Sequence, residues 1–237
     1  MVQGGYVKLF FISAFTLVSL GSASAQSLNK LPKLNVDKSS ITVSGVSAGG
    51  FMAVQLHVAL SSVFKGAGSV SGGVYWCSEG SALTAQTQCM KNPSSLNADD
   101  YVRRAMSEAK ANRVEKLENL KTSKVFIFAS KQDSVIKSES SDRLYEFYTK
   151  FVPKSQISYQ NQIPSGHGWV TNKYGNSCES QATPWINNCN YDLAGEILKQ
   201  FYGPLKANRN NREGLRSQLY PFDQQEFQSQ NSALFDY

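Results

Sequence analysis

The fold of this chain is decided by residues 39–64, which read SSITVSGVSAGGFMAVQLHVALSSVF. The run Ser39–Ser44 contains several β-branched residues and stops at Gly45, as a short strand does. The period then changes, because apolar residues recur at three- and four-residue steps at Met52, Leu56, Leu60 and Val63. We therefore expect an amphipathic helix from Ala48 to about Phe64, directly after the strand.

The turn between this strand and helix reads Gly45-Val46-Ser47-Ala48-Gly49, the Gly-x-Ser-x-Gly pattern of a nucleophile elbow. Such a turn is tight, and we expect a side chain at either glycine to collide with the neighbouring strand or helix. It also points the first amides of the helix at the serine, where an oxyanion forms during acyl transfer. The pattern predicts Ser47 as a nucleophile and the Ala48 N–H as an oxyanion donor.

The rest of the chain alternates between strand-like and helix-like segments. Strands are expected within 66–75, at 124–129 and at 156–163, and helices are expected at 98–120, 138–151 and 192–202. Residues 77–97 are expected to be a loop. This alternation predicts an α/β fold with a parallel sheet covered by helices on both faces.

A serine nucleophile needs a base, and the chain contains two histidines. His57 falls within the predicted helix and is expected to be a partly exposed helix residue. His167 lies in a glycine-flanked loop after the last predicted strand, where hydrolases of this architecture place their base, and is the predicted base.

The acid of such a triad comes between serine and histidine in the chain. Asp133 follows the strand 124–129 and fits this order. Glu139 and Asp142 fall within the next helix and are weaker candidates, and Asp192 comes after His167. The pattern predicts a triad of Ser47, Asp133 and His167.

Composition narrows the class of protein further. The hydrophobic share of 41% and the charged share of 18% exclude a disordered chain. The net charge is +6, but the basic residues are scattered, with the densest group at Lys206, Arg209, Arg212 and Arg216, so nucleic acid is not an expected partner. No metal cluster, phosphate loop or dinucleotide fingerprint is present, so no cofactor and no metal are expected.

The first 25 residues have the parts of a signal peptide. Lys8 is followed by an apolar run from Leu9 to Leu20, about half the length of a membrane span, and Ala23-Ser24-Ala25 forms a small-x-small cleavage site. We expect cleavage near Ala25, secretion, and no stable membrane insertion.

Four cysteines remain after this leader, at positions 77, 89, 178 and 189, and allow three disulfide connectivities. The nearest-neighbour pairing would pin two local loops. Zinc is the less favoured alternative, because the Cys-x-x-Cys spacing of zinc knuckles is missing.

Several separated motifs together resemble one known family. They are residues 43–56 (VSGVSAGGFMAVQL), Tyr75-Trp76-Cys77, Gly166-His167-Gly168-Trp169, residues 188–192 (NCNYD) and residues 222–227 (FDQQEF). In this order they resemble the secreted poly(3-hydroxybutyrate) depolymerases, which have a circularly permuted α/β-hydrolase catalytic domain.

The resemblance carries implications for residues and for domain organisation. It places Ser47, Asp133 and His167 at the triad positions and Ala48 at an oxyanion position, and it pairs Cys77 with Cys89 and Cys178 with Cys189. In the family, further strands follow this region and lead to the second oxyanion donor. The resemblance thus implies a catalytic region at 26–205, and at 206–237 a polar segment that begins a second half missing from this chain.

The expected function is a secreted serine esterase that acts on poly(3-hydroxybutyrate) or related short-chain polyesters. Trp76, Trp169 and Trp185 flank the expected site, and either form an apolar platform for polymer or pack into the core. Two alternatives remain open. One is an esterase for soluble feruloyl or acetyl esters, and the other is a secreted remnant with little turnover that at most binds polymer. The oligomeric state is not predicted.

Overall fold

A computed structural model of the chain describes residues 29–206, 220–224 and 227. The chain divides into two units, one formed by Asn35–Arg209 and the other by residues 1–34 and 210–237. In the second unit, Asn29 and Phe222 form an isolated parallel bridge, and the Asp223 N–H donates to the Asn29 carbonyl at 2.9 Å. The expected leader at 1–25 and most of the expected polar segment at 206–237 lie outside the described residues.

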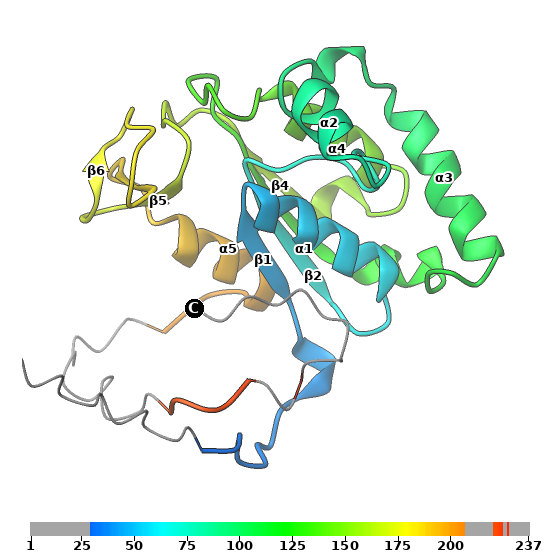
Figure 1. Cartoon of the computed structure of the whole chain (residues 1–237). Coiled ribbons are helices and arrows are strands. Elements are labelled where there is room, and N and C mark those ends of the chain that lie inside the picture. Colours follow the sequence, from blue (N-terminus) through cyan, green and yellow to red (C-terminus); the bar gives the residue numbers. More distant parts are fainter. Residues whose placement is uncertain (1–28, 207–219, 225–226, 228–237) are drawn as a thin grey trace, which may run out of the picture. The chain divides into compact units, whose positions relative to one another are not determined.

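The unit Asn35–Arg209 is built on a four-stranded parallel sheet (Figure 1). Its strands are β1 (Val43–Val46), β2 (Gly66–Val70), β3 (Lys124–Phe128) and β4 (Ile157–Gln160), in the spatial order β1-β2-β3-β4. The register pairs Val46 with Val70, Val70 with Phe128 and Phe128 with Gln160. All four strands therefore end at the same edge of the sheet, and the residues that follow them meet there.

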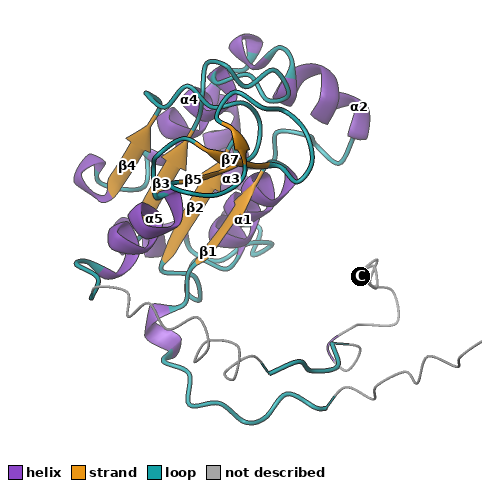
Figure 2. Cartoon of the chain, turned by 90° about the vertical axis from the view of Figure 1, so that its left-hand side faces the viewer, coloured by secondary structure: helices purple, strands orange, loops and turns teal. Residues whose placement is uncertain are grey.

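Helices cover both faces of this sheet, as the alternating sequence predicts. Figure 2 shows α1 (Ala48–Ala59) and α5 (Leu193–Tyr202) on opposite sides of the strands. The side chains of β3 alternate accordingly, because successive residues of a strand face opposite ways. Val125 and Ile127 belong to the core cluster that includes Val54 and Val58 of α1, whereas Phe126 and Phe128 pack with Leu193, Ile197 and Phe201 of α5.

Two further long helices supply residues to the core cluster on the face that carries α1. They are α3 (Ala98–Lys110) and α4 (Glu139–Tyr148), with the short α2 (Ala82–Thr84) and a π-helical turn, η2 (Ala85–Met90). The described residues also contain four short 3-10 helices: η1 (Lys38–Ser40), η3 (Pro93–Ser95), η4 (Leu117–Thr122) and η5 (Lys154–Gln156). No helix of the described residues is long and apolar enough to cross a bilayer.

Several predicted boundaries differ from the structure for local reasons. The first strand runs through Gly45 to Val46, because the elbow begins only at Ser47. The helix predicted for 98–120 ends at Lys110, since Asn112 adopts a left-handed backbone with φ of 54°. The region 77–97, predicted as loop, contains α2, η2 and η3.

A second, smaller sheet follows His167 and was not predicted. It contains β5 (Trp169–Thr171), β6 (Asn176–Ser177) and β7 (Ile186–Asn188) in the order β5-β7-β6, and all its pairs are parallel. Strands of two or three residues carry too little periodicity to be read from a sequence.

Candidate active site

Ser47 lies in a strained turn between β1 and α1, as the elbow pattern predicts. Its φ of 58° and ψ of −122° place a non-glycine residue in a region that L-residues rarely occupy. The turn is held by the Ser47 N–H, which donates to the Val70 carbonyl at 2.8 Å, and by the Ser47 carbonyl, which accepts from the Phe51 N–H at 3.0 Å. Backbone contacts on both sides thus fix the serine at the edge where the strands end.

The glycines of the elbow do not play the equal roles that the sequence suggested. A Cβ at Gly45 would lie 2.5 Å from the carbonyl carbon and oxygen of Gly49, so this position requires glycine. A Cβ at Gly49 would meet no atom within 4 Å, so the expected collision at that position is wrong. The second tight position is Gly50, where a Cβ would lie 2.8 Å from the Val70 carbonyl oxygen. The helix approaches β2 at Gly50, one residue later than the pattern indicates.

Asp133 and His167 are brought together, although 34 residues separate them in the chain. His167 Nδ1 lies 2.8 Å from Asp133 Oδ2, and both side chains are buried. The other carboxylate oxygen, Oδ1, accepts from the backbone N–H groups of Val135 and Ile136, each at 2.9 Å. The carboxylate is therefore held by its own turn and presents one oxygen to the imidazole.

The pKa of Asp133 is lowered from its ordinary value. Burial alone would raise this pKa, but the hydrogen bonds from His167, from the Ile136 N–H and from the Ser71 side chain outweigh it. An ionised carboxylate only accepts hydrogen bonds, so the imidazole donates from Nδ1, and Nε2 is the position of the lone pair in the neutral ring. This is the tautomer that a general base at Nε2 requires.

Ser71 is a residue of this site that sequence reasoning missed. It directly follows β2, has a φ of 46° and is buried beside Asp133, and its N–H donates to the Phe128 carbonyl at 2.9 Å. The signal is topological, because Ser71 follows β2 just as Ser47 follows β1, and Val46 and Val70 are partners in register.

The three predicted triad residues lie on loops or turns after β1, β3 and β4, whose ends meet at one edge of the sheet. The acid and the base are hydrogen-bonded, whereas within the described part of the chain the Ser47 hydroxyl makes no hydrogen bond to His167. In enzymes without a bound substrate, the distance between nucleophile and base often exceeds that of a hydrogen bond. Ala48, the predicted oxyanion donor, is the first residue of α1, so its N–H has no acceptor within the helix.

His57 is not a second candidate for the base, and the expectation that it is partly exposed is wrong. Its side chain is fully buried, and Nδ1 lies 2.9 Å from the hydroxyl of Tyr148 in α4. Burial lowers the pKa of His57 to about 4. The expectation of partial exposure failed because α4 covers the face of α1 that carries His57.

Two of the other candidate acids have structural roles. Asp142 Oδ1 accepts from the Tyr159 hydroxyl at 2.7 Å, and Asp192 caps α5 by accepting from the Gly195 N–H at 3.0 Å. Glu139 is in the first turn of α4.

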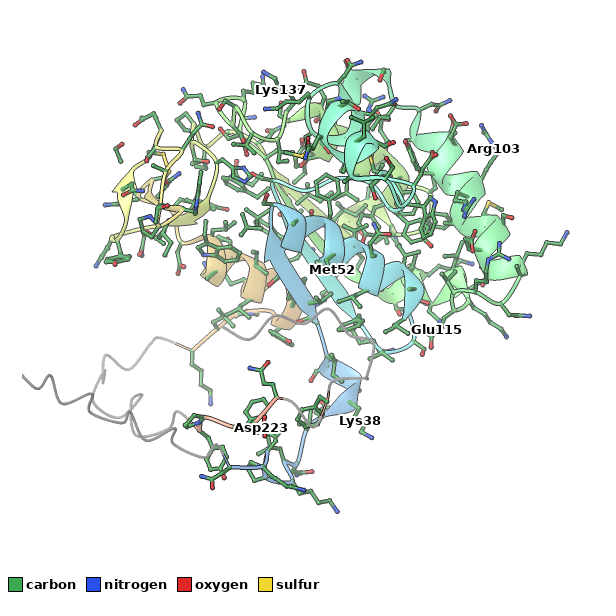
Figure 3. All side chains as sticks on the ribbon, viewed as in Figure 1. Lys38, Met52, Arg103, Glu115, Lys137 and Asp223 are labelled. Carbon is green, nitrogen blue, oxygen red and sulfur yellow. A yellow bond between two sulfur atoms is a disulfide. The ribbon has the colours of Figure 1, made fainter. Side chains whose placement is uncertain are left out.

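A largely apolar cavity of about 360 Å³ opens beside Ser47. The disulfide Cys77–Cys89 forms part of its wall, and its other lining residues include Ala48, Phe51, Met52, Gln55, Met90 and Ile136. Met52 lies on the outer face of α1 and is half exposed (Figure 3). A carbonyl group held at Ser47 would therefore have its alkyl substituents next to apolar side chains.

The three tryptophans have different surroundings, and neither Trp76 nor Trp169 lines this cavity. Trp76 is partly exposed, with the Arg104 guanidinium 4.8 Å above its ring. Trp169 is half buried and packs against the core cluster under α5. Trp185 is the tryptophan beside the predicted base, because its ring centre lies 6.0 Å from that of His167, edge to face.

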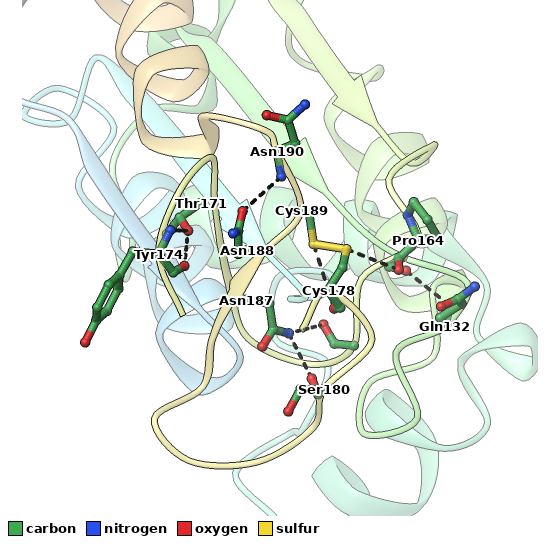
Figure 4. Close-up of a disulfide and its surroundings, with 12 residues drawn as sticks. Gln132, Pro164, Thr171, Tyr174, Cys178, Ser180, Asn187, Asn188, Cys189 and Asn190 are labelled. Atoms are coloured by element: carbon green, nitrogen blue, oxygen red, sulfur yellow. Dashed lines mark hydrogen bonds between the residues drawn. A yellow bond between two sulfur atoms is a disulfide. The ribbon is translucent and has the colours of Figure 1, made fainter. Parts of the chain in front are cut away.

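Both predicted disulfides are present. Cys77 and Cys89 have Cα atoms 5.9 Å apart, and Cys178 and Cys189 have Cα atoms 4.7 Å apart. The first closes the segment that walls the cavity, and the second closes the loop beyond His167 (Figure 4).

The sheet is parallel, a serine elbow follows one strand, and a hydrogen-bonded acid and base follow two others. This arrangement defines an α/β-hydrolase. The chain belongs to the prolyl oligopeptidase family, whose model matches residues 23–191. It is 42% identical over 216 residues to a poly(3-hydroxybutyrate) depolymerase of Delftia acidovorans, covering 91% of this chain and 43% of that protein. It is 34% identical to a polyhydroxybutyrate depolymerase of Talaromyces funiculosus, covering 81% of this chain and 56% of that protein.

Solved structures show similarity to the same kind of protein. The crystal structure of a PHB depolymerase from Penicillium funiculosum matches with a TM-score of 0.69 and 31% identity, over 78% of this chain and 57% of that chain. A PHB depolymerase complexed with an R3HB trimer matches with a TM-score of 0.70, over the same shares. The resemblance and the parallel α/β fold are confirmed, and the chain spans about half the length of the curated relatives it matches.

Proposed function

We propose that this chain carries the catalytic triad of a secreted serine esterase that hydrolyses poly(3-hydroxybutyrate) or a related short-chain polyester. The observation that carries the proposal is the hydrogen bond between Asp133 and His167, at the sheet edge where the Ser47 elbow also lies. The similarity to depolymerases supports the polyester as substrate. The two disulfides support an oxidising compartment outside the cytoplasm.

In the proposed reaction, Ser47 Oγ forms a bond to the ester carbonyl carbon while its proton passes to His167 Nε2. The ester C–O bond then breaks, and His167 returns the proton to the leaving alkoxide oxygen. Water attacks the resulting acyl-serine, gives one proton to His167 and thence to Ser47 Oγ, and releases the carboxylic acid. Asp133 holds the imidazole by its Nδ1–H, and the Ala48 N–H donates to the carbonyl oxygen as negative charge develops there.

The cavity beside Ser47 supports a substrate with short alkyl substituents. Its lining is mostly apolar, so the methyl groups of a 3-hydroxybutyrate unit would be removed from water there.

Covalent labelling tests the nucleophile. A fluorophosphonate probe should label the wild-type chain and leave the folded Ser47→Ala variant unlabelled. Folded wild-type protein that takes up no probe would contradict the triad.

Product analysis tests the substrate. Release of 3-hydroxybutyrate from the polymer, measured beside hydrolysis of a small soluble butyrate ester, should show activity on both. Activity on the soluble ester alone would mean that the substrates are soluble acyl esters and not the polyester.

A further inference from the structure

Both glycines that flank His167 pack against the loop Cys178–Cys189, which we call the second disulfide loop. A Cβ at Gly166 would lie 2.2 Å from the Ser180 carbonyl oxygen, and one at Gly168 would lie 2.7 Å from the Trp185 carbonyl oxygen. The Gly166 N–H also donates to the Cys178 carbonyl at 2.8 Å. The backbone of the second disulfide loop therefore forms the support on which His167 rests.

A buried amide inside the loop strengthens this support. Asn187 is fully buried, and its Nδ2 donates to the Ser180 carbonyl at 2.8 Å and to the Gly166 carbonyl at 3.3 Å (Figure 4). One side chain thus joins the loop to the residue that precedes His167.

The same loop also reaches the turn that carries the acid. Gln181 Oε1 accepts from the Ser134 N–H at 2.8 Å and from the Ser134 hydroxyl at 2.5 Å. Ser134 directly follows Asp133, and the next two N–H groups bind the Asp133 carboxylate. Gln181 is consequently attached to one end of the turn that orients Asp133.

We propose that Gln181 is a positioning residue of the triad. By binding Ser134, it ties the turn of Asp133 to the loop that supports His167 and so keeps the acid and the base at hydrogen-bond distance. It acts through these two residues and touches no reacting atom. This inference rests on the proposed triad function.

Three variants of the full chain test the proposal. Gln181→Met removes the acceptor at nearly constant side-chain size, and Gln181→Glu keeps acceptor oxygens at the same reach. Glu179→Ala is the matched control, because this exposed side chain of the same loop makes no hydrogen bond or ion pair to the described residues. The readouts are kcat and KM on a soluble butyrate ester, and the NMR signal of the His167 Nδ1 proton.

We expect Gln181→Met to lower kcat about tenfold to a hundredfold with little change in KM, because a small misplacement of reacting groups costs rate on this scale. The Nδ1 proton signal should weaken. Gln181→Glu should restore most of both readouts, and Glu179→Ala should match the wild type. A wild-type kcat and proton signal in Gln181→Met would overturn the proposal, as would equal losses in the Met and Glu variants.

Failure of the inference is distinguishable from failure of the proposed function. If the wild-type chain is inactive, the proposed function fails, and the Nδ1 proton signal still decides whether Gln181 holds the acid and base together. If Gln181→Met does not fold, Ser134→Ala removes one of the two donors and should lower kcat in the same direction. An unchanged kcat in folded Ser134→Ala would then overturn the proposal.

Discussion

Val46 and Val70 are partners in register across β1 and β2, so Ser47 and Ser71 leave the sheet side by side. Both residues have positive φ, of 58° and 46°. The first is the proposed nucleophile, and the second lies against the Asp133 carboxylate. Two adjacent strand ends therefore supply the proposed nucleophile and a serine that lies against the proposed acid.

Replacement of Ser71 should weaken catalysis without unfolding the protein. Ser71→Ala removes a hydrogen-bond donor from a buried carboxylate, so we expect kcat/KM to fall about tenfold, equivalent to about 1.4 kcal/mol. Ser61→Ala is the control, because it removes a hydrogen bond from a buried serine to the Lys116 carbonyl, away from the site. Equal kcat/KM in the wild type and Ser71→Ala would show that the contact with Asp133 does not contribute to catalysis.

The two glycines of the elbow should respond in opposite ways to alanine. A Cβ at Gly45 collides with the backbone of Gly49, so we expect Gly45→Ala to lower the free energy of unfolding by about 3 kcal/mol. Gly49→Ala meets open space within α1, so a gain of about 0.5–1 kcal/mol is expected from helix propensity. Urea unfolding of both variants measures the difference, and similar losses in the two would contradict the contacts described for the elbow.

The buried His57 should make stability depend on pH. Its pKa is lowered from an ordinary 6.5 to about 4, so the unfolded chain binds a proton between these values that the folded chain does not. Stability should thus rise with pH through this window and lose about 3 kcal/mol as pH falls from 6.5 to 4.

The variant His57→Phe isolates this contribution, because it fills the same space with a ring that does not titrate. Urea unfolding at pH 7 and pH 4.5 should show a larger acid-induced loss in the wild type than in His57→Phe. Parallel pH profiles for the two proteins would rule out His57 as the source.

The cavity beside Ser47 should set the size of acyl group that is accepted. Met90→Trp places a larger side chain in its wall, so we expect kcat/KM on a butyrate ester to fall about tenfold relative to an acetate ester. Leu83→Trp, at an exposed position that does not line the cavity, is the control. An unchanged butyrate-to-acetate ratio in Met90→Trp would mean that the acyl group binds elsewhere.

Much of the site could be predicted from the sequence, because short sequence patterns and the order of motifs mark its residues. The strand before Ser47 and the helix after it follow from residues close together in sequence, and the candidates for acid and base follow from the order of motifs along the chain. The bond between Asp133 and His167 was predicted from that order and is present in the structure. The burial of His57 and the open space at Gly49 could not be predicted, because each depends on a neighbour far away in the chain.

The sequence by itself determined the parallel α/β architecture and the elbow at Ser47, because periodicity and turn chemistry can be read from neighbouring residues. The pairing of the cysteines followed from the family resemblance of its motifs. Only the tertiary structure decided which side chains support these residues. Ser71, Gln181 and Asn187 carry no local pattern, and they reach Asp133 or the residue before His167 because parallel strands end at one edge and a disulfide-closed loop folds back over it. Contacts between distant segments arise from packing, which a linear pattern does not record.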